Sequence, residues 1–263
     1  MNLRLATWNV NSLAVRLPQL LDWLVANPVD ALVLQETKLT DDKFPQAEIE
    51  AAGYAVAFHG QKTYNGVALL SRGGAAADVV KNIPGFADEQ ARVITGTVGT
   101  GAAAVRVIGG YFPNGQAPDS DKFVYKMAWL DALHSFVQAE LAAHPRLVLM
   151  GDFNIAPDDR DAWDPVSLAG TIHLTKEERA QFQRLLGLGL HDAFRLFEQA
   201  PKLYSWWDYR MLAFRKNQGL RIDHILVSDA LKPAVQACAI DRAPRKNERP
   251  SDHAPVVVEI ARG

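Results

Sequence analysis

The stretch from Leu147 to Asn154 reads LVLMGDFN, and it sets the pattern on which the rest of the chain is built. Four apolar residues come first, and an acid and an amide then stand where such a strand should end. Asp152 and Asn154 are two positions apart, so an extended backbone would direct both side chains to the same face. The stretch predicts a buried strand from Leu147 to Asp152 with chemically useful groups at its carboxyl end.

Short apolar runs and helical patterns alternate along the whole chain, without a low-complexity linker or a fixed-period repeat. Composition and turn-rich flanks predict further strands at Leu3–Trp8, Ala31–Gln35, Tyr54–Phe58, Val67–Ser71, Val93–Val98, Val105–Tyr111, Ile222–Ser228 and Val256–Ile260. Helices are predicted from the apolar stripe Leu17, Leu20, Leu21 and Leu24, over Phe123–Leu141, and from Thr175, which has capping-box spacing to Glu178. Because strands outnumber helices, we expect an α/β protein in which sheets pack on each other with helices outside, a layered α/β sandwich.

The composition is that of an ordinary globular protein, with 263 residues of which 48% are hydrophobic and 22% charged. We expect a single domain over residues 1–263, because α/β and sandwich folds often reach this size undivided.

The sequence contains no uncharged apolar run near the roughly 18 residues of a membrane helix, and Met1 leads directly to Arg4 without a signal-peptide core. We therefore expect no membrane association and a cytoplasmic location. The one cysteine, Cys238, fits a reducing compartment and is expected to be a small buried core residue.

The charges are distributed unevenly, although 28 basic and 30 acidic residues leave a net charge of only −2. Between Lys202 and Arg221, five basic residues and five aromatic residues accompany a single acid, Asp208. Such a mixture suits a backbone of phosphates that carries stackable bases or sugars. A second basic cluster follows at Arg242, Arg245, Lys246 and Arg249. A solvated loop over core aromatic residues explains the first stretch equally well, so both interpretations stay open at this point.

Polar residues also stand at the ends of other predicted strands. They are Asn9 and Asn11 in TWNVN, Glu36 in LVLQETK, Asp223 in GLRIDHILVS, and Asp252 with His253 in RPSDHAPV. Any one of them alone is explained by a structural or capping role. Together, carboxylates and amides with at most one imidazole are hard oxygen ligands, which select Mg²⁺ or Mn²⁺ over zinc. Since Mg²⁺ commonly shares phosphate oxygens of a substrate, the set predicts hydrolysis of phosphate esters.

The chain resembles the exonuclease III family of DNA-repair nucleases (the AP endonuclease family) through motifs that occur in the family's order between residues 7 and 256. These motifs are TWNVNSLAVR, LQETK, YNGVALLSR, GYFPNG, GDFNIAP, YSWWDYR, GLRIDHILVS and SDHAPV. The family is part of the endonuclease/exonuclease/phosphatase superfamily. The resemblance implies a four-layer α/β sandwich, with two packed mixed β-sheets flanked by helices. It also implies a hydrolase that uses Mg²⁺ or Mn²⁺ and acts on duplex DNA as a 3′-5′ exodeoxyribonuclease and a 3′-phosphatase. Incision at abasic sites stays open.

The same resemblance implies a group of metal-binding residues. Glu36 would be the principal ligand, with Asn9 and Asp252 assisting directly or through water. The whole group expected around the metal is Asn9, Glu36, Asp152, Asn154, Asp252 and His253. The number of metal ions and the preferred cation are left open.

Catalytic roles are implied for five residues of these motifs. Asp152 would orient or deprotonate the attacking water, and Asn154 would contact the scissile phosphate. His253 would donate to a phosphate oxygen, while Asp223 holds the imidazole in its productive tautomer and stabilises its charge. Tyr111 in GYFPNG would place its phenol at the phosphate or the leaving group, although capping a strand with the ring in the core is the alternative.

DNA-binding roles are implied for a further set of residues. Asn11 and Asn114 would complete the rim that faces the phosphate. Trp206, Leu220 and Ile222 match the apolar pocket that receives a flipped abasic sugar, with core packing as the alternative. Arg210 and Met211 lie in the segment that would enter a DNA groove.

His173 departs from the family pattern. The family usually has Gly or Ser just before the helix that Thr175 opens, whereas this chain reads GTIHLTKEER. We hypothesise that the imidazole obstructs DNA that continues past the scissile phosphate, while frayed or recessed 3′ ends still enter. Trimming of 3′ ends and removal of 3′-phosphates would then be favoured over internal incision at abasic sites.

Two other functions are compatible with this fold. One is a non-catalytic nucleic-acid-binding regulator, which the presence of every motif acid argues against. The other is a phosphatase of the wider superfamily that acts on lipids or inositol phosphates, which the basic and aromatic loop argues against. The expected partner is double-stranded DNA with abasic sites or with blocked or recessed 3′ ends, and we expect a monomer.

Overall fold

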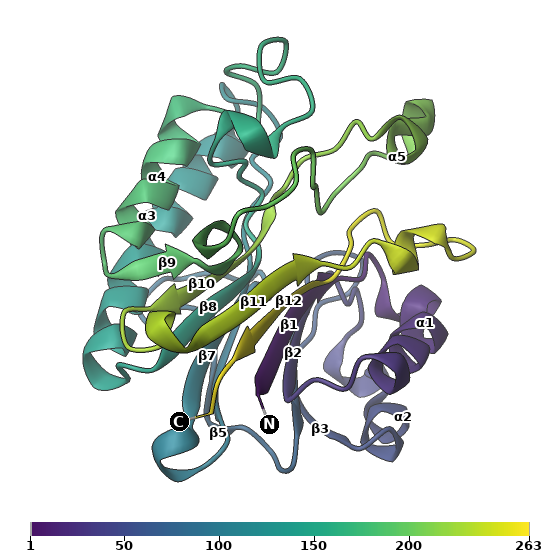
Figure 1. The fold of residues 1–263 in the computed structure, drawn as a ribbon, viewed down its shortest axis with the longest axis vertical. Helices are drawn as coiled ribbons and strands as arrows, with labels where there is room; N and C mark the ends of the chain where they lie inside the picture. Colours follow the sequence, from purple (N-terminus) through teal and green to yellow (C-terminus); the bar gives the residue numbers. More distant parts are fainter. Residues whose placement is uncertain (1, 263) are drawn as a thin grey trace.

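Two six-stranded mixed sheets form the centre of the protein in this computed structural model, which describes residues 2–262 (Figure 1). The first sheet has the strand order β11-β12-β1-β2-β4-β3, and the second has the order β5-β6-β7-β8-β10-β9. The strands are β1 (Leu3–Asn9), β2 (Ala31–Gln35), β3 (Tyr54–His59), β4 (Val67–Arg72), β5 (Ala77–Lys81), β6 (Val93–Val98), β7 (Val105–Tyr111), β8 (Leu147–Asp152), β9 (Leu190–Asp192), β10 (Asp223–Ser228), β11 (Val235–Ile240) and β12 (Val256–Ile260).

Helices cover the outer face of each sheet. They are α1 (Leu13–Ala26), α2 (Gln46–Ala51), α3 (Asp121–Ala143) and α4 (Lys176–Leu186), whereas the short α5 (Ala213–Lys216) lies in the projecting loop before β10 (Figure 1). Helices α1 and α2 lie on one side of the sandwich and α3 and α4 on the other (Figure 1). The four layers expected from the resemblance are therefore confirmed.

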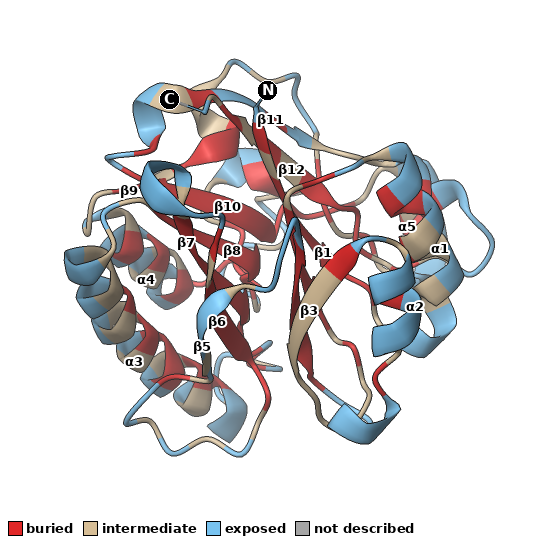
Figure 2. Ribbon diagram, turned by 90° about the horizontal axis from the view of Figure 1, so that it is seen from below, coloured by how far each residue is buried: buried red, intermediate tan, exposed pale blue. Residues whose placement is uncertain are grey.

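Three apolar cores hold these layers together. One lies between the sheets and includes Leu5, Val33, Val107 and Val148. A second joins the first sheet to α1 and α2, and a third joins the second sheet to α3 and α4. Buried residues fill the strands, while the exposed residues of the helices face outward (Figure 2). Strands β2, β8 and β10 are buried along their whole length, which explains their nearly continuous apolar runs.

A parallel pair of strands in each sheet determines where the polar strand ends meet. Strands β1 and β2 are parallel and align Asn9 with Gln35, and β7 and β8 are parallel and align Tyr111 with Asp152. Strand β10 runs antiparallel to β8, so its first residue, Asp223, pairs with Asp152. The carboxyl ends of both parallel pairs are thereby brought to one end of the sandwich.

The sheets approach each other closely at Gly109 of β7. A Cβ atom at this position would lie 2.4 Å from Cγ1 of Val33 in β2, so a larger side chain would push the sheets apart. Glycine is needed here for lack of space and not for an unusual backbone conformation.

The nine strands and three helices expected from the sequence are present, with ends that differ by a few residues. Three strands, β5, β9 and β11, were not predicted, nor were α2 and α5. The capping box at the start of α4 is confirmed, because Thr175 accepts from Glu178 N and Glu178 accepts from the Thr175 backbone. Cys238 is buried, as expected. Among residues 2–262, none of the helices has the length and apolar character that a membrane crossing requires.

Candidate active site

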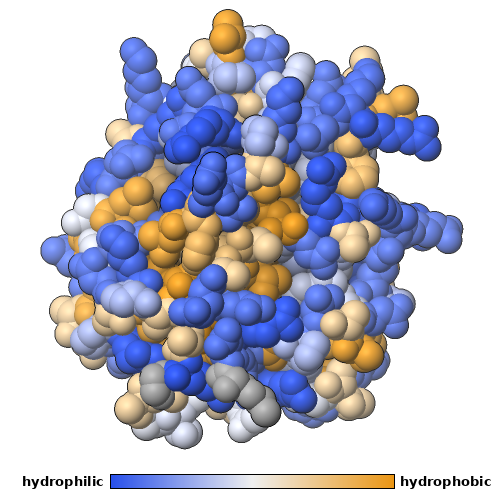
Figure 3. All heavy atoms as spheres, in the orientation of Figure 1, coloured by the Kyte–Doolittle hydropathy of each residue, from blue (hydrophilic) through white to orange (hydrophobic). Residues whose placement is uncertain are grey.

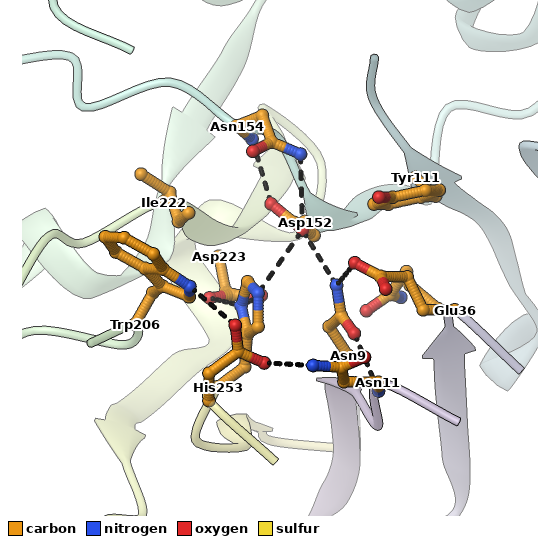
Figure 4. Close-up of polar contacts among 12 residues, drawn as sticks. Asn9, Asn11, Glu36, Tyr111, Asp152, Asn154, Trp206, Ile222, Asp223 and His253 are labelled. Atoms are coloured by element: carbon orange, nitrogen blue, oxygen red, sulfur yellow. Dashed lines mark hydrogen bonds and ion pairs between the residues drawn. The ribbon is translucent and has the colours of Figure 1, made fainter. Parts of the chain in front are cut away.

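Side chains from both sheets meet at the end of the sandwich where the parallel strands finish (Figure 4). Asn9 connects the two sheets, because its Nδ2 donates to Glu36 Oε1 at 2.8 Å and to Asp152 Oδ2 at 2.9 Å. Asn9 ends β1, Glu36 follows β2, and Asp152 ends β8. The contact joins residues 143 positions apart in the chain, so the site exists only when the two sheets are packed together.

Glu36, Asp152 and His253 form the group best placed to hold a metal ion. One ligand atom from each lies within 4.8 Å of the others. The two carboxylates match the chemistry of a divalent cation that accepts oxygen ligands, whereas the imidazole could ligate a metal only with one ring nitrogen unprotonated.

His253 is held between two carboxylates. Its Nδ1 lies 2.9 Å from Asp223 Oδ2, and its Nε2 lies 3.7 Å from Asp152 Oδ2. Burial opposes the charged form of the imidazole, but the carboxylates of Asp223 and Asp152 outweigh it and raise the pKa of His253 to about 10. The ring is therefore charged at neutral pH, with Nδ1–H donated to Asp223 and Nε2–H directed toward the site.

Asp152 is fully buried at the centre of the group. Burial raises the pKa of its carboxyl group to about 7, and the nearby Asp223 adds to this, while His253 and the Asn9 amide oppose it. A carboxylate with a pKa near neutrality has the basicity that a proton acceptor needs at physiological pH.

Asn154 reaches Asp152 through a tight turn. Its backbone has φ 51°, and its N–H donates to Asp152 Oδ1 at 2.9 Å. Its side chain Nδ2 donates to Asp152 Oδ2 at 3.3 Å and to Phe112 O at 3.1 Å, and its Oδ1 accepts from Asn114 Nδ2. The sequence predicted that an extended strand directs Asp152 and Asn154 to the same face. Strand β8 instead ends at Asp152, and the turn at Asn154 brings the two side chains together.

The backbone oxygen of Asn154 has two buried donors. Lys126 Nζ lies 2.8 Å from it, and His173 Nδ1 also lies 2.8 Å from it. Since a carbonyl oxygen only accepts, His173 carries its proton on Nδ1. Burial, with the neighbouring Lys126 charge, lowers the pKa of His173 to about 4, so the ring is neutral at pH 7.

Glu36 lies in a loop with an unusual backbone. Glu36 and Lys38 have φ angles of 52° and 56°. Two backbone hydrogen bonds hold the loop, from Thr37 N to Gly66 O at 3.1 Å and from Lys38 N to Asn65 O at 3.0 Å. Gly66 itself has φ +87°, and a Cβ there would lie 2.2 Å from Thr37 Oγ1. Asn65 and Gly66 of the YNG motif therefore hold the Glu36 loop in its conformation.

Tyr111 lies beside Glu36 and Asp152, and Figure 4 shows its hydroxyl directed toward the polar side chains of the site. Burial raises the pKa of this phenol well above its usual value, and the carboxylates of Glu36 and Asp152 add to the effect. The Arg92 guanidinium lies 5.0 Å from the centre of the Tyr111 ring. Tyr111 is therefore protonated, and it is able to donate a hydrogen bond.

Asp252 lies at the edge of the group and not in its centre. Its Oδ1 accepts from Asn11 Nδ2 at 2.9 Å, and its Oδ2 accepts from the Trp206 indole at 2.9 Å. The closely spaced group of Glu36, Asp152 and His253 does not include it. Asp252 thus connects the site to the loop that contains Trp206.

A pocket of about 900 Å³ opens beside the site, and its wall is mainly apolar. Five of the residues expected to bind DNA line it: His173, Trp206, Arg210, Met211 and Leu220. Ile222 is buried and packs behind Leu220 and Trp206. Elsewhere, apolar side chains gather near the centre of the face that Figure 3 presents, over the region of β9 to β11 in Figure 1, and hydrophilic side chains surround them.

The tip of the basic and aromatic loop is exposed. Met211 is 78% exposed and has φ 58°. The Arg210 guanidinium pairs with Asp208 at 2.7 Å and is itself exposed. Tyr204 and Trp207, by contrast, are buried, as a solvated loop over core aromatic residues would have them, and phosphate binding by this stretch stays a prediction.

A second pocket, of about 630 Å³, lies on the Glu36 side of the site. It is lined by Glu36, Tyr111 and Asn114 and by the cations Lys38, Arg92 and Lys122. Lys38, Arg92 and Lys126 were not among the expected site residues. The sequence could have indicated two of them. Lys38 is part of the LQETK motif, and Lys126 is a basic residue among the apolar residues of α3, where the structure buries it.

His224 faces away from the site, as strand alternation suggests, and its Nε2 donates to Ile155 O while its Nδ1 accepts from Arg221. Burial lowers the pKa of His224 to about 4, which agrees with a neutral ring.

Comparison with known proteins agrees with this geometry. Residues 6–253 match the model of the endonuclease/exonuclease/phosphatase family. The chain is 36% identical to exodeoxyribonuclease III of Haemophilus influenzae, covering 98% of this chain and 100% of that protein.

Solved structures are similar over nearly the whole chain. The 3′ phosphatase NExo from Neisseria, in a complex with a product DNA hairpin, is 49% identical with a TM-score of 0.95, covering 98% of this chain and 99% of that one. An AP endonuclease from Archaeoglobus fulgidus is 34% identical with a TM-score of 0.92, with the same coverage. The chain therefore belongs to the exonuclease III and AP endonuclease family of DNA-repair nucleases, within the endonuclease/exonuclease/phosphatase superfamily.

Proposed function

We propose that this protein is a Mg²⁺-dependent hydrolase that processes 3′ ends in duplex DNA, removing 3′-phosphates and 3′-terminal nucleotides. The observation that carries the proposal is the convergence of Glu36, Asp152 and His253 within 4.8 Å, beside a mainly apolar pocket. The similarity to the Neisseria 3′ phosphatase and to an exodeoxyribonuclease III supports the same substrate class.

Glu36 would be the principal metal ligand, with Asp152 and His253 nearby and Asn9, Asn154 and Asp252 around them. The carboxylate oxygens of Glu36 and Asp152 fit Mg²⁺, or Mn²⁺ in its place, because both cations prefer oxygen ligands. Mg²⁺ bound there would polarise the phosphate and offset the negative charge that develops on it.

Asp152 would take a proton from the attacking water. Its pKa of about 7 gives it both a substantial deprotonated fraction and adequate basicity at neutral pH. The two donors of Asn154 and the amide of Asn9 fix the carboxylate in place. We therefore assign Asn154 to positioning Asp152; to contact the phosphate as well, its Nδ2 would have to release Asp152 or Phe112 O.

His253 would stabilise the more negative transition state. Its charged ring keeps Nδ1–H on Asp223, which leaves Nε2–H for a nonbridging phosphate oxygen. Tyr111 would donate to the phosphate or the leaving oxygen, and Asn11 and Asn114 would line the rim. Each of these contacts strengthens as charge builds on the phosphate, which is the condition for catalysis.

The 3′-terminal residue of the DNA would enter the pocket formed by Trp206 and Leu220, with Ile222 supporting it. Arg210 and Met211, at the exposed loop tip, would contact a groove of the duplex. An apolar pocket favours a sugar that has lost its base or a terminal residue that has frayed.

His173 would decide how far the DNA extends beyond the scissile phosphate. The neutral ring is fixed by its bond to Asn154 O and lines the pocket as a neighbour of Trp206, with ring centres 6.4 Å apart. We therefore propose that ends are favoured over internal abasic sites. The similarity to an AP endonuclease keeps abasic incision as a second candidate activity.

The purified protein should be assayed on duplexes with an internal abasic site, a recessed 3′ end or a 3′-phosphate, and on an inositol phosphate, each with Mg²⁺ or EDTA. We expect Mg²⁺-dependent turnover of the recessed and 3′-phosphate duplexes. DNA binding without any metal-dependent cleavage would favour a regulator, and turnover of the inositol phosphate alone would favour a phosphatase of the wider superfamily.

The variant His173→Gly tests the proposed obstruction. Glycine removes the ring and tolerates the φ of 75° at this position. We expect the ratio of abasic incision to exonuclease rate to increase by at least tenfold. An unchanged ratio would contradict the steric role of the imidazole.

A further inference from the structure

Lys38 places a positive charge against the carboxylate expected to hold the metal. Its Nζ lies 2.9 Å from Glu36 Oε2 and also donates to Asn11 Oδ1. The other carboxylate oxygen, Glu36 Oε1, accepts from the Asn9 amide. One oxygen of Glu36 therefore faces a neutral donor, and the other faces an ammonium group.

The backbone fixes this contact. Glu36 and Lys38 both have positive φ, a conformation that is unfavourable for residues with a Cβ atom and that tends to persist at functional sites. The hydrogen bonds of Thr37 and Lys38 to Gly66 and Asn65 hold the loop in that shape. The pair is also partly shielded, with exposed fractions of 26% for the Lys38 side chain and 17% for that of Glu36. It is more than a pair of mobile surface side chains.

The surroundings offer Lys38 a different anion. The pocket of about 630 Å³ that it lines also contains Arg92 and Lys122, and Glu36 is the carboxylate on its wall. Arg92 is buried, and its guanidinium donates to Gln90 Oε1 and to the Tyr111 carbonyl, both of which are neutral acceptors. A pocket with three cations and one carboxylate suits a phosphate group.

We propose that Lys38 is a counter-charge that a divalent cation must displace from Glu36 and that a DNA phosphate then accepts, so that metal and DNA bind cooperatively. The inference rests on the proposed function, since it takes DNA as the source of the phosphate. In the free protein, the ammonium competes for the Glu36 oxygen and weakens metal binding. When DNA arrives, Lys38 gains a new partner, and Glu36 becomes free for the metal.

The coupling must act in both directions. If DNA increases the affinity for the metal, then the metal increases the affinity for DNA by the same factor. A lysine that only supported the loop would behave differently, because its loss would weaken metal binding. The proposal predicts the opposite sign.

The test is a titration of the full-length protein with Mn²⁺, followed by electron paramagnetic resonance, without DNA. Lys38→Met removes the charge and keeps the length of the side chain. We expect Lys38→Met to bind Mn²⁺ about tenfold more tightly than the wild type, which corresponds to about 1.4 kcal/mol. Lys38→Arg keeps the charge and should bind like the wild type. Lys122→Met removes another cation of the same pocket, away from the Glu36 pair, and should also bind like the wild type.

The second arm repeats the titration with a DNA hairpin whose 3′-terminal linkages are phosphorothioates, so that it is not degraded. DNA should raise the Mn²⁺ affinity of the wild type by about tenfold and that of Lys38→Met by much less. Equal or weaker Mn²⁺ binding by Lys38→Met without DNA would overturn the proposal, as would an equal effect of DNA on both proteins. Absence of Mn²⁺ binding by both proteins would overturn it too. Because the first arm contains no DNA, a failure of the proposed nuclease function is detected separately, by the cleavage assays.

Discussion

Asp152 is the residue whose chemistry the proposed reaction needs most directly. Replacing it with Asn removes the proton acceptor and keeps the size of the side chain. We expect kcat on a recessed duplex to fall by about 10²–10⁴-fold, the usual contribution of a general base, while DNA affinity changes little.

The measurement is single-turnover cleavage together with fluorescence anisotropy of labelled DNA. Asp229→Asn is a suitable control, because Asp229 lies just beyond the opposite end of β10 and pairs with His191. If Asp152→Asn retains most of the wild-type rate, the assignment of the base is incorrect.

His173 gives a prediction about stability at acid pH. Its pKa is about 4 in the folded protein, against 6.5 for an ordinary histidine. Below pH 6.5 the histidine is protonated in the unfolded chain but stays neutral in the folded chain. The contribution of His173 to the free energy of unfolding is therefore fully present above pH 6.5 and is lost as the pH falls toward 4. At pH 4 the loss would be about 3 kcal/mol, since each pKa unit corresponds to about 1.4 kcal/mol.

His173→Asn removes the titrating group, keeps a donor for Asn154 O and tolerates the positive φ. Urea denaturation at pH 7, 5.5 and 4.5 should show that the stability of the variant relative to wild type improves as the pH falls. A difference that stays constant over this range would show that His173 is not held neutral by its surroundings.

At the scale of elements, the loop after β2 is the part of the site most dependent on a neighbouring segment. Gly66→Ala introduces a Cβ that would lie 2.2 Å from Thr37 Oγ1 at a residue with φ +87°. We expect a loss of about 1–3 kcal/mol in the free energy of unfolding and a clear loss of metal affinity, because Glu36 moves with Thr37.

Gly53→Ala is the matched control for this change. Gly53 has φ +90°, but a Cβ there meets nothing within 4 Å. Both variants should therefore lose stability through the backbone conformation, and only Gly66→Ala should lose Mn²⁺ binding in a titration. Equal Mn²⁺ affinity in the two variants would show that the turn at Gly66 does not position Glu36 for metal binding.

Of the nine strands that sequence patterns predicted, all but β3 are inner strands of their sheets. Strand β8, for example, is buried throughout and appears as a continuous apolar run. The three unpredicted strands, β5, β9 and β11, are all edge strands of their sheets. Strand β5 is mostly exposed and β9 has three residues, so neither has the apolar run on which a strand prediction depends.

The sequence predicted which residues form the candidate site better than it predicted their geometry. Strand-end position and motif order indicated Glu36, Asp152 and His253, and the structure brings them together. The turn at Asn154 was not predicted, because Asn adopts a positive φ more readily than most residues but the GDFN segment fits an extended backbone equally well. Arg92 was missed for a related reason, since its importance comes from facing Tyr111 in a neighbouring strand.

At the scale of the whole molecule, the position of one sheet relative to the other sets the distances in the site. Gly109 and Val33 face each other between the sheets, where a Cβ atom at position 109 would lie 2.4 Å from Val33 Cγ1. Gly109→Ala should therefore destabilise the protein by about 1–3 kcal/mol through overpacking.

A double-mutant cycle measures this contact. Val33→Ala opens space opposite position 109, so the pair Gly109→Ala with Val33→Ala should be more stable than the sum of the two single effects predicts, by at least 0.5 kcal/mol. Chemical denaturation of the four proteins gives the coupling energy. Simple additivity would mean that the sheets adjust without strain and that their spacing is not fixed at this point.

The contact of Asn9 with Glu36 and Asp152 has a consequence for biosynthesis. The ribosome makes Asn9 early, and the imidazole at position 253 follows more than two hundred residues later. A nascent chain that has emerged only as far as the opening strands of the first sheet carries Asn9 and Glu36 but neither Asp152 nor His253. The proposed site is complete only after translation has passed residue 253, so we expect an unfinished polypeptide to lack nuclease activity.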